Sequence, residues 1–140
     1  MKKLAVAILL VAGLTLVGCG SSNTTNINGN WTATLTGSQN FTFTTSLVTN
    51  SDGTLTITKL SFSSNSCFVS GETETGTFAL SGNFNGSVTG AFGMIVHSGT
   101  PSGNVLTLTG NVKQNTITGN WTLVGGGNCN GTGSFTMNKS

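Results

Sequence analysis

Ionisable side chains are scarce in this sequence, and their scarcity excludes several classes of function. The 140 residues include five Lys or Arg residues, three Asp or Glu residues and one His. Every basic residue is a lysine, so arginine is absent. A surface that binds nucleic acid needs clustered Lys and Arg side chains, and scattered lysines do not supply one. The same shortage argues against electrostatic adhesion to anionic lipid headgroups.

Acid–base chemistry and metal binding also lack the residues that they need. His97 is the only histidine, and no nucleophile or orienting carboxylate is identifiable for it. The cysteines and His97 show no zinc-ligand spacing. Glu72 and Glu74 are a close carboxylate pair that could form half of a cation site or a glycosidase pair. We interpret them as solvated charges that discourage edge pairing, and we predict no catalytic residue, metal or cofactor.

The first 18 residues have the composition of an export signal. Lys2 and Lys3 precede an apolar run of about a dozen residues, and small residues lead up to Cys19. A membrane-spanning helix needs roughly 20 apolar residues, so the run is too short to span a bilayer. A buried core helix would not explain the basic start and the cysteine at the end.

The end of this segment, Leu16-Val17-Gly18-Cys19, resembles the lipobox of bacterial lipoproteins. The resemblance implies that residues 1–18 are a lipoprotein signal peptide and that Cys19 becomes a lipidated first residue. The alternative is a plain secreted protein. If Cys19 is lipidated, the lipid is expected to hold the chain in the bacterial cell envelope. Gly20 stands where an aspartate retention signal would lie, which favours the outer membrane if the host has two membranes. Residues 19–28 are small and polar and are predicted to form a flexible tether.

The remaining segment, residues 29–140, is predicted to be a single domain without net charge. Three lysines, Lys59, Lys113 and Lys139, balance Asp52, Glu72 and Glu74. If Cys19 carries lipid, Cys67 and Cys129 remain as a pair, which an oxidising compartment would join in a disulfide. Two buried free thiols are the alternative.

Apolar residues recur with a period of two, which predicts half-buried antiparallel strands. Trp31, Ala33 and Leu35 alternate with threonines, and similar runs follow as far as Phe135 and Met137. Asp52-Gly53 and Asn85-Gly86 predict two-residue hairpin turns, and residues 113–115 suit a slightly longer turn. Ile57 and Leu60 both need the core face, so we expect a β-bulge near Lys59.

The runs predict an all-β fold of about eight or nine strands in an antiparallel meander. Four glycines lie at apolar-face positions, where bare backbone lets strands coil and lets an aromatic ring lie over it. They are Gly82, Gly90, Gly110 and Gly119. We therefore expect a closed or nearly closed small barrel; the alternative is a β-sandwich.

The start of the first strand, Gly29-Asn30-Trp31, resembles the Gly-x-Trp signature of lipocalins, and its surroundings resemble the first strand of avidin-type barrels. The resemblance implies that Trp31 closes one end of an eight-stranded barrel around a small ligand. Trp121 occurs in the same Gly-Asn-Trp-Thr setting, so both tryptophans are expected to face inward and are candidate ligand-binding residues.

Two hypotheses for function follow from these features. The first is a non-enzymatic structural or protein-interaction module of the cell envelope. The second is a lipocalin-like or avidin-like carrier of a small apolar ligand. An eight-stranded barrel can be filled by its own side chains or can hold one ligand, and the many large inward residues favour a filled barrel. The sequence does not specify the oligomeric state.

Overall fold

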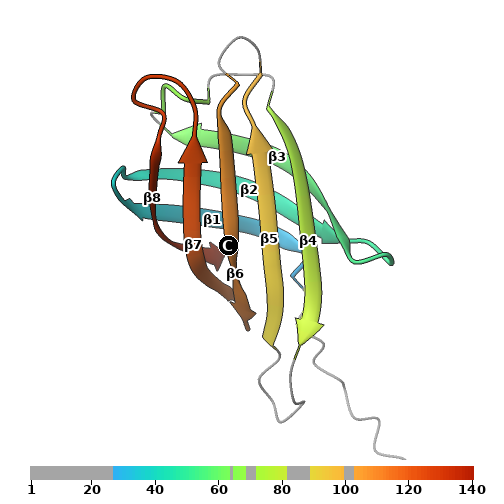
Figure 1. The fold of residues 1–140 in the computed structure, drawn as a ribbon. Coiled ribbons are helices and arrows are strands. Elements are labelled where there is room, and N and C mark those ends of the chain that lie inside the picture. The colour runs from blue at the N-terminus through green and yellow to red at the C-terminus, as the bar shows by residue number, and fades with distance from the viewer. Residues whose placement is uncertain (1–26, 64, 69–71, 82–88, 100–102) are drawn as a thin grey trace, which may run out of the picture.

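In the computed structural model, eight antiparallel strands close into a barrel (Figure 1). The structure describes residues 27–63, 65–68, 72–81, 89–99 and 103–140, and no helix occurs among them. The strands are β1 (Gly29–Gly37), β2 (Phe41–Thr49), β3 (Thr54–Ser63), β4 (Thr73–Ser81), β5 (Thr89–His97), β6 (Val105–Lys113), β7 (Thr116–Val124) and β8 (Gly131–Lys139). The expected all-β barrel with meander connections is confirmed, because each strand pairs with the next and β8 pairs with β1.

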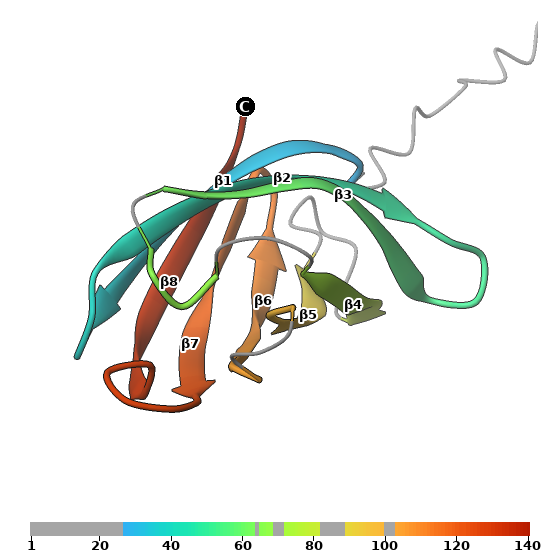
Figure 2. The same ribbon diagram turned by 90° about the horizontal axis from the view of Figure 1, so that it is seen from above.

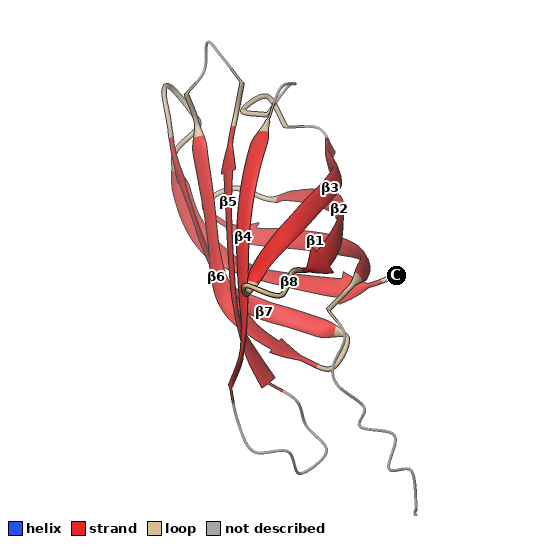
Figure 3. Ribbon diagram, turned by 90° about the vertical axis from the view of Figure 1, so that its right-hand side faces the viewer, coloured by secondary structure: helices blue, strands red, loops and turns tan. Residues whose placement is uncertain are grey.

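The barrel is flattened, and its strands run in two main directions. Strands β1, β2 and β3 cross steeply over β4 to β7, as the views from the front and from above show (Figures 1 and 2). The side view shows β3 and β4 diverging from one another (Figure 3). Among the described residues they pair only at Thr54–Thr77 and Leu55–Gly76. We call this loosely paired boundary the β3–β4 seam.

The predicted alternation sets the two faces of the strands. In β1, Trp31, Ala33 and Leu35 are buried, whereas the threonines between them are exposed. The largest fully buried side chains of the strands come from β1, β2 and β5 to β8 and include Trp31, Phe43, Leu47, Met94, Leu108, Ile117, Trp121 and Met137. Burial of this apolar face against the opposite wall provides the main driving force for folding.

Three buried core residues, Ile27, Cys67 and Phe68, lie outside the strands. Phe68 is buried and stacks on Phe62 of β3, with ring centroids 4.5 Å apart. Ile27, assigned to the tether by the sequence, is buried, and its carbonyl oxygen accepts a hydrogen bond from the Trp31 indole at 2.7 Å. Asn28 accepts a hydrogen bond from the Thr49 amide at 2.6 Å. The last two residues of the expected tether therefore pack on the barrel.

The β-bulge expected near Lys59 is confirmed. Thr44 pairs with Ser61 and Ser46 pairs with Thr58, so two residues of β3 face one residue of β2. Lys59 takes up the extra length with a φ of 55°. The bulge lets Ile57 and Leu60 both pack against the core, as their sequence positions required.

The turn before β3 differs from the prediction. Asn50 and Thr54 close it through a backbone hydrogen bond of 2.9 Å, so three residues lie between them and the two-residue form is wrong. A type I′ turn needs positive φ at both central residues, and only Gly53 has it, at 83°. The Asp52 carboxylate instead accepts hydrogen bonds from the hydroxyl and the amide of Thr54, which lower its pKa.

Two further turns were predicted. The turn after Lys113 contains two residues, because Lys113 pairs with Thr116, and it is shorter than expected. Gln114 adopts a φ of 55° there. The turn predicted at Asn85-Gly86, like Gly82, lies outside the described residues.

Inward glycines accept the aromatic rings as the sequence suggested. A Cβ atom on Gly90 would lie 2.2 Å from the Phe78 ring, so Phe78 covers bare backbone at this point. Gly110 and Gly119 stand opposite one another on β6 and β7. A Cβ atom on Gly119 would lie 2.1 Å from the Thr109 carbonyl oxygen and 2.5 Å from the Gly110 Cα atom. The two strands can approach this closely only because both residues lack a side chain.

Substitution of Gly119 tests this close approach. We expect Gly119→Ala to lower the free energy of unfolding by about 1–3 kcal/mol, because its methyl group must push backbone apart. Gly126→Ala is the matched control, since a Cβ atom there would meet nothing within 4 Å. Urea unfolding of both variants checks the expectation, and equal stabilities for the two would contradict it.

Candidate functional site

A polar hollow of about 500 Å³ opens at one end of the barrel. We call this end the mouth; its described residues are 38–40, 65–68, 72, 98–99, 103–104 and 125–130, which connect the strands there. The hollow lies where the β1–β2, β3–β4 and β7–β8 connections meet. Its lining consists of Ser38, Gln39, Asn40, Phe41, Asn65, Ser66, Cys67, Gly127, Asn128 and Asn130.

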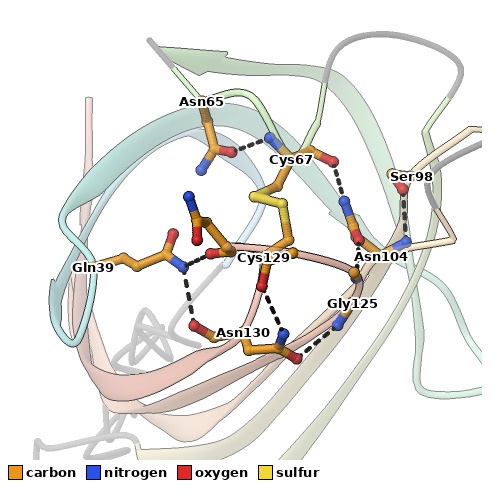
Figure 4. The surroundings of a disulfide bond; sticks show 11 residues. Gln39, Asn65, Cys67, Ser98, Asn104, Gly125, Cys129 and Asn130 are labelled. Carbon is orange, nitrogen blue, oxygen red and sulfur yellow. Dashed lines mark hydrogen bonds between the residues drawn. A yellow bond between two sulfur atoms is a disulfide. The ribbon is translucent and has the colours of Figure 1, made fainter.

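The predicted disulfide lies at the hollow, which Cys67 lines, and Figure 4 shows its surroundings. Cys67 and Cys129 are bonded with their Cα atoms 5.7 Å apart, which is an ordinary distance for a disulfide. The bond ties the β3–β4 connection to the β7–β8 connection across 62 positions of sequence. The alternative of two free thiols is therefore wrong.

A buried asparagine that the sequence analysis did not single out supports the disulfide loops from below. Asn104 is 2% exposed, and both polar atoms of its side chain have a hydrogen-bond partner. It donates a hydrogen bond to the Cys67 carbonyl oxygen at 3.0 Å and accepts one from the Gly126 amide at 3.2 Å (Figure 4). The main-chain amide of Asn104 donates a hydrogen bond to the Ser98 hydroxyl at 2.9 Å. Asn104 thus joins three of the mouth connections.

Further side-chain bonds hold the rim in place. Gln39 donates from its amide nitrogen to the carbonyl oxygens of Asn128 and Asn130 (Figure 4). The Asn130 side chain accepts a hydrogen bond from the Gly125 amide at 3.1 Å and donates to the Gly127 carbonyl oxygen at 3.3 Å. The β1–β2 and β7–β8 connections are therefore fixed to one another as well.

Some polar groups of the lining are left for a ligand. The side-chain oxygen of Asn65, Oδ1, accepts a hydrogen bond from the main-chain amide of Cys67 at 2.7 Å, which leaves the side-chain nitrogen of Asn65, Nδ2, to donate elsewhere. Within the described part of the chain, that nitrogen, the Ser66 hydroxyl and the Asn128 side chain have no hydrogen-bond partner. Ser66 and Asn128 are exposed, and Asn65 is half-buried. These groups can bind without breaking a bond that shapes the hollow.

Of the described residues that line the hollow, none carries a charged side chain and none is a histidine. Glu72 directly precedes β4 and Glu74 is the second residue of β4, where the described strand pairs with β5; both side chains are half-buried. Glu74 stands opposite the buried Val96. His97 is exposed at the end of β5, on the outer face as expected. Among the described residues, no three His, Cys, Asp or Glu side chains come together as a metal site.

Trp31 and Trp121 both face inward, as predicted, and both are 1% exposed. The Trp121 indole donates to the Thr36 carbonyl oxygen at 3.1 Å. Its ring meets the edge of Phe41, with centroids 5.6 Å apart. Phe41 also lines the hollow, so Trp121 lies one layer beneath its floor, whereas Trp31 packs at the other end of β1 beside Ile27.

The predicted lipid anchor lies outside the described residues. Residues 1–26 include the whole signal segment and Cys19. Of the residues that the structure describes, none belongs to a helix long and apolar enough to cross a membrane.

The disulfide is expected to make a large contribution to stability. Closing a loop of 62 positions stabilises the fold by about 4 kcal/mol on the chain-entropy estimate. We expect the Cys67→Ala, Cys129→Ala double variant to lose most of that amount in urea unfolding, and a reductant to destabilise the unaltered chain similarly. Ser66→Ala, in the same connection, is the control. A reductant that leaves the midpoint of the unaltered chain in place would contradict the expectation.

No protein-family model, curated protein or solved structure matches this chain. The likeness of Gly29-Asn30-Trp31 to lipocalin and avidin-type barrels therefore stays a prediction from the residues themselves.

Proposed function

We propose that this chain is a lipid-anchored, non-enzymatic binding module of the bacterial cell envelope, which holds its partner at the mouth of the barrel. The observation that carries the proposal is the contrast between the two ends of the inner space. The interior is occupied by packed apolar side chains, whereas the mouth has a polar hollow with unused hydrogen-bonding groups. Binding at the mouth needs no rearrangement of the core.

The packing of the interior supports this function over an apolar carrier. In a hollow barrel, the inward aromatic rings would contact a ligand. In this barrel they contact one another. Phe43 and Phe62 have centroids 5.2 Å apart, and Phe92 and Phe135 have centroids 6.3 Å apart. Trp121 packs on Phe41 in the same way. A small barrel can be filled by its side chains in this manner.

The direction of the chain supports presentation of the mouth away from the membrane. Residue 27 lies at the end of the barrel where β1 begins, and the nine residues of β1 lead from there to Ser38 at the mouth. A strand of nine residues spans about 30 Å. A lipid on Cys19 would therefore hold the end opposite the mouth against the bilayer.

The composition of the hollow favours binding over catalysis. General acid–base catalysis needs a group whose pKa can be brought near the working pH, and the lining offers amides, hydroxyls, a ring and a disulfide. The hollow is therefore suited to holding a partner by hydrogen bonds.

The anchor can be tested by fractionation. Cys19→Ser removes the sulfur that would carry the lipid, so we expect the protein to leave the detergent-soluble membrane fraction or to persist as a larger, uncleaved form. Immunoblots of fractionated cells measure both outcomes. Co-migration of the variant with the unaltered protein, in size and in fraction, would refute the lipid anchor.

The binding site can be tested by photo-crosslinking in cells. A photo-reactive amino acid at Ser66 reports on the mouth, and the same amino acid at the exposed Asn120 of β7 reports on the outer wall. We expect adducts of increased mass from position 66 and none from position 120. Adducts only from position 120, or from neither position, would overturn the proposal that the mouth is the binding site.

A further inference from the structure

We infer that the mouth hollow binds an uncharged glycan, a short run of neutral sugar units. The inference rests on the proposed function, because it assigns a ligand class to the same mouth. Its support comes from the charge of the lining, the kind of hydrogen-bonding groups that it offers, and the rigidity of the rim.

The lining favours a ligand without charge. None of the ten lining residues is acidic, basic or a histidine. An ion that leaves water for such a site would lose hydration without gaining a counter-charge, which is unfavourable. Phosphorylated, sulfated and cationic ligands are therefore poor matches for the hollow.

The lining also favours a polar ligand over an apolar one. Seven of the ten lining residues carry an amide or a hydroxyl: Ser38, Gln39, Asn40, Asn65, Ser66, Asn128 and Asn130. Phe41 contributes little apolar surface, since it is only 7% exposed. Amides and hydroxyls offer donors and acceptors side by side, and each sugar hydroxyl both donates and accepts. A polyhydroxylated ligand can satisfy both kinds of group at once.

The hollow is less suited to a peptide. Extended peptides commonly bind by adding a strand to a free sheet edge, where main-chain groups provide the affinity. The hollow is lined by connecting loops, and Gln39 already occupies the carbonyl oxygens of Asn128 and Asn130. The groups without a partner among the described residues include the side chains of Asn65, Ser66 and Asn128, which suit recognition of ligand hydroxyls.

The rim is organised before any ligand arrives. The Cys67–Cys129 disulfide, the Asn104 side chain and the Gln39 side chain hold the surrounding loops together (Figure 4). Binding to a rigid site costs less conformational entropy than binding to loops that must first be ordered. The volume of about 500 Å³ falls in the usual range for small-ligand sites.

Titration of the full chain with neutral oligosaccharides tests the inference. The protein is purified in a detergent without a sugar headgroup, and maltohexaose, cellohexaose and fully N-acetylated chitohexaose are titrated by isothermal calorimetry. We expect at least one of them to bind. The Asn65→Ala, Asn128→Ala double variant should bind about tenfold more weakly or worse, because two hydrogen-bonding amides are lost. Asn120→Ala, on the outer wall of β7, should leave the affinity unchanged.

A second variant keeps the test decisive if loss of the Asn65 bond to Cys67 disturbs folding. Asn128→Trp places a large ring over the hollow at an exposed position whose side chain makes no bond among the described residues. It should abolish glycan binding while the urea midpoint stays unchanged. Glycan binding that survives this variant would overturn the inference.

The outcome also separates the inference from the proposed function. If no oligosaccharide binds but position 66 crosslinks to a protein, the glycan inference fails and the binding module stands. If no oligosaccharide binds and position 66 yields no adduct, both fail. Binding that depends on Asn65 and Asn128 supports both.

Discussion

The packing of large rings over bare backbone is the interaction on which the rest of this barrel depends. The domain has few charges, so apolar burial must supply most of its stability. A closed barrel of eight strands has little inner space. Tryptophan and phenylalanine side chains fit inside it where a residue of a nearby strand has no side chain. Inward glycines such as Gly90 provide that room, because the Phe78 ring lies where a side chain would otherwise be. Closure, register and the buried alternation all follow from this fit.

The mouth is held together mainly by a disulfide and by side-chain hydrogen bonds. Strand pairing is sparse at the β3–β4 seam, so the connection between these strands cannot be held by the sheet alone. A covalent bond to the β7–β8 connection, the stacking of Phe68 on Phe62 and the buried Asn104 replace the missing backbone ladder. The connections held in this way place the side chains of Asn65, Ser66 and Asn128 at the rim, where they keep hydrogen-bonding groups without a partner among the described residues. The least regular part of the fold is therefore the part best equipped to bind.

The sequence predicted the features that repeat or that depend on a single residue type. Period-two alternation placed Trp31 and Trp121 inside, a parity conflict located the bulge at Lys59, and counting cysteines paired Cys67 with Cys129. The turn before β3 was misjudged because Asp52 bonds to Thr54 instead of adopting a positive φ. The hollow was not foreseen. Asn65, Asn104 and Asn128 have no spacing that marks them, since loops far apart in sequence bring them together only after the barrel has closed.

The course of β1 has a mechanical consequence. If the chain is held by its N-terminus and a partner pulls at the mouth, the load enters at Ile27 and runs along β1 to Ser38. Both neighbours of β1 pair with it along its length, β2 from Gly29–Leu47 to Leu35–Phe41 and β8 from Trp31–Lys139 to Gly37–Gly133. The hydrogen bonds between antiparallel strands lie perpendicular to the strands. A force along β1 therefore loads all the hydrogen bonds of the β1–β2 and β1–β8 ladders together, and does not break them one after another. A partner held by Asn65, Ser66 and Asn128 pulls on the β3–β4 and β7–β8 connections, and the Cys67–Cys129 disulfide joins these two connections, so the sparsely paired β3–β4 seam does not bear the load alone.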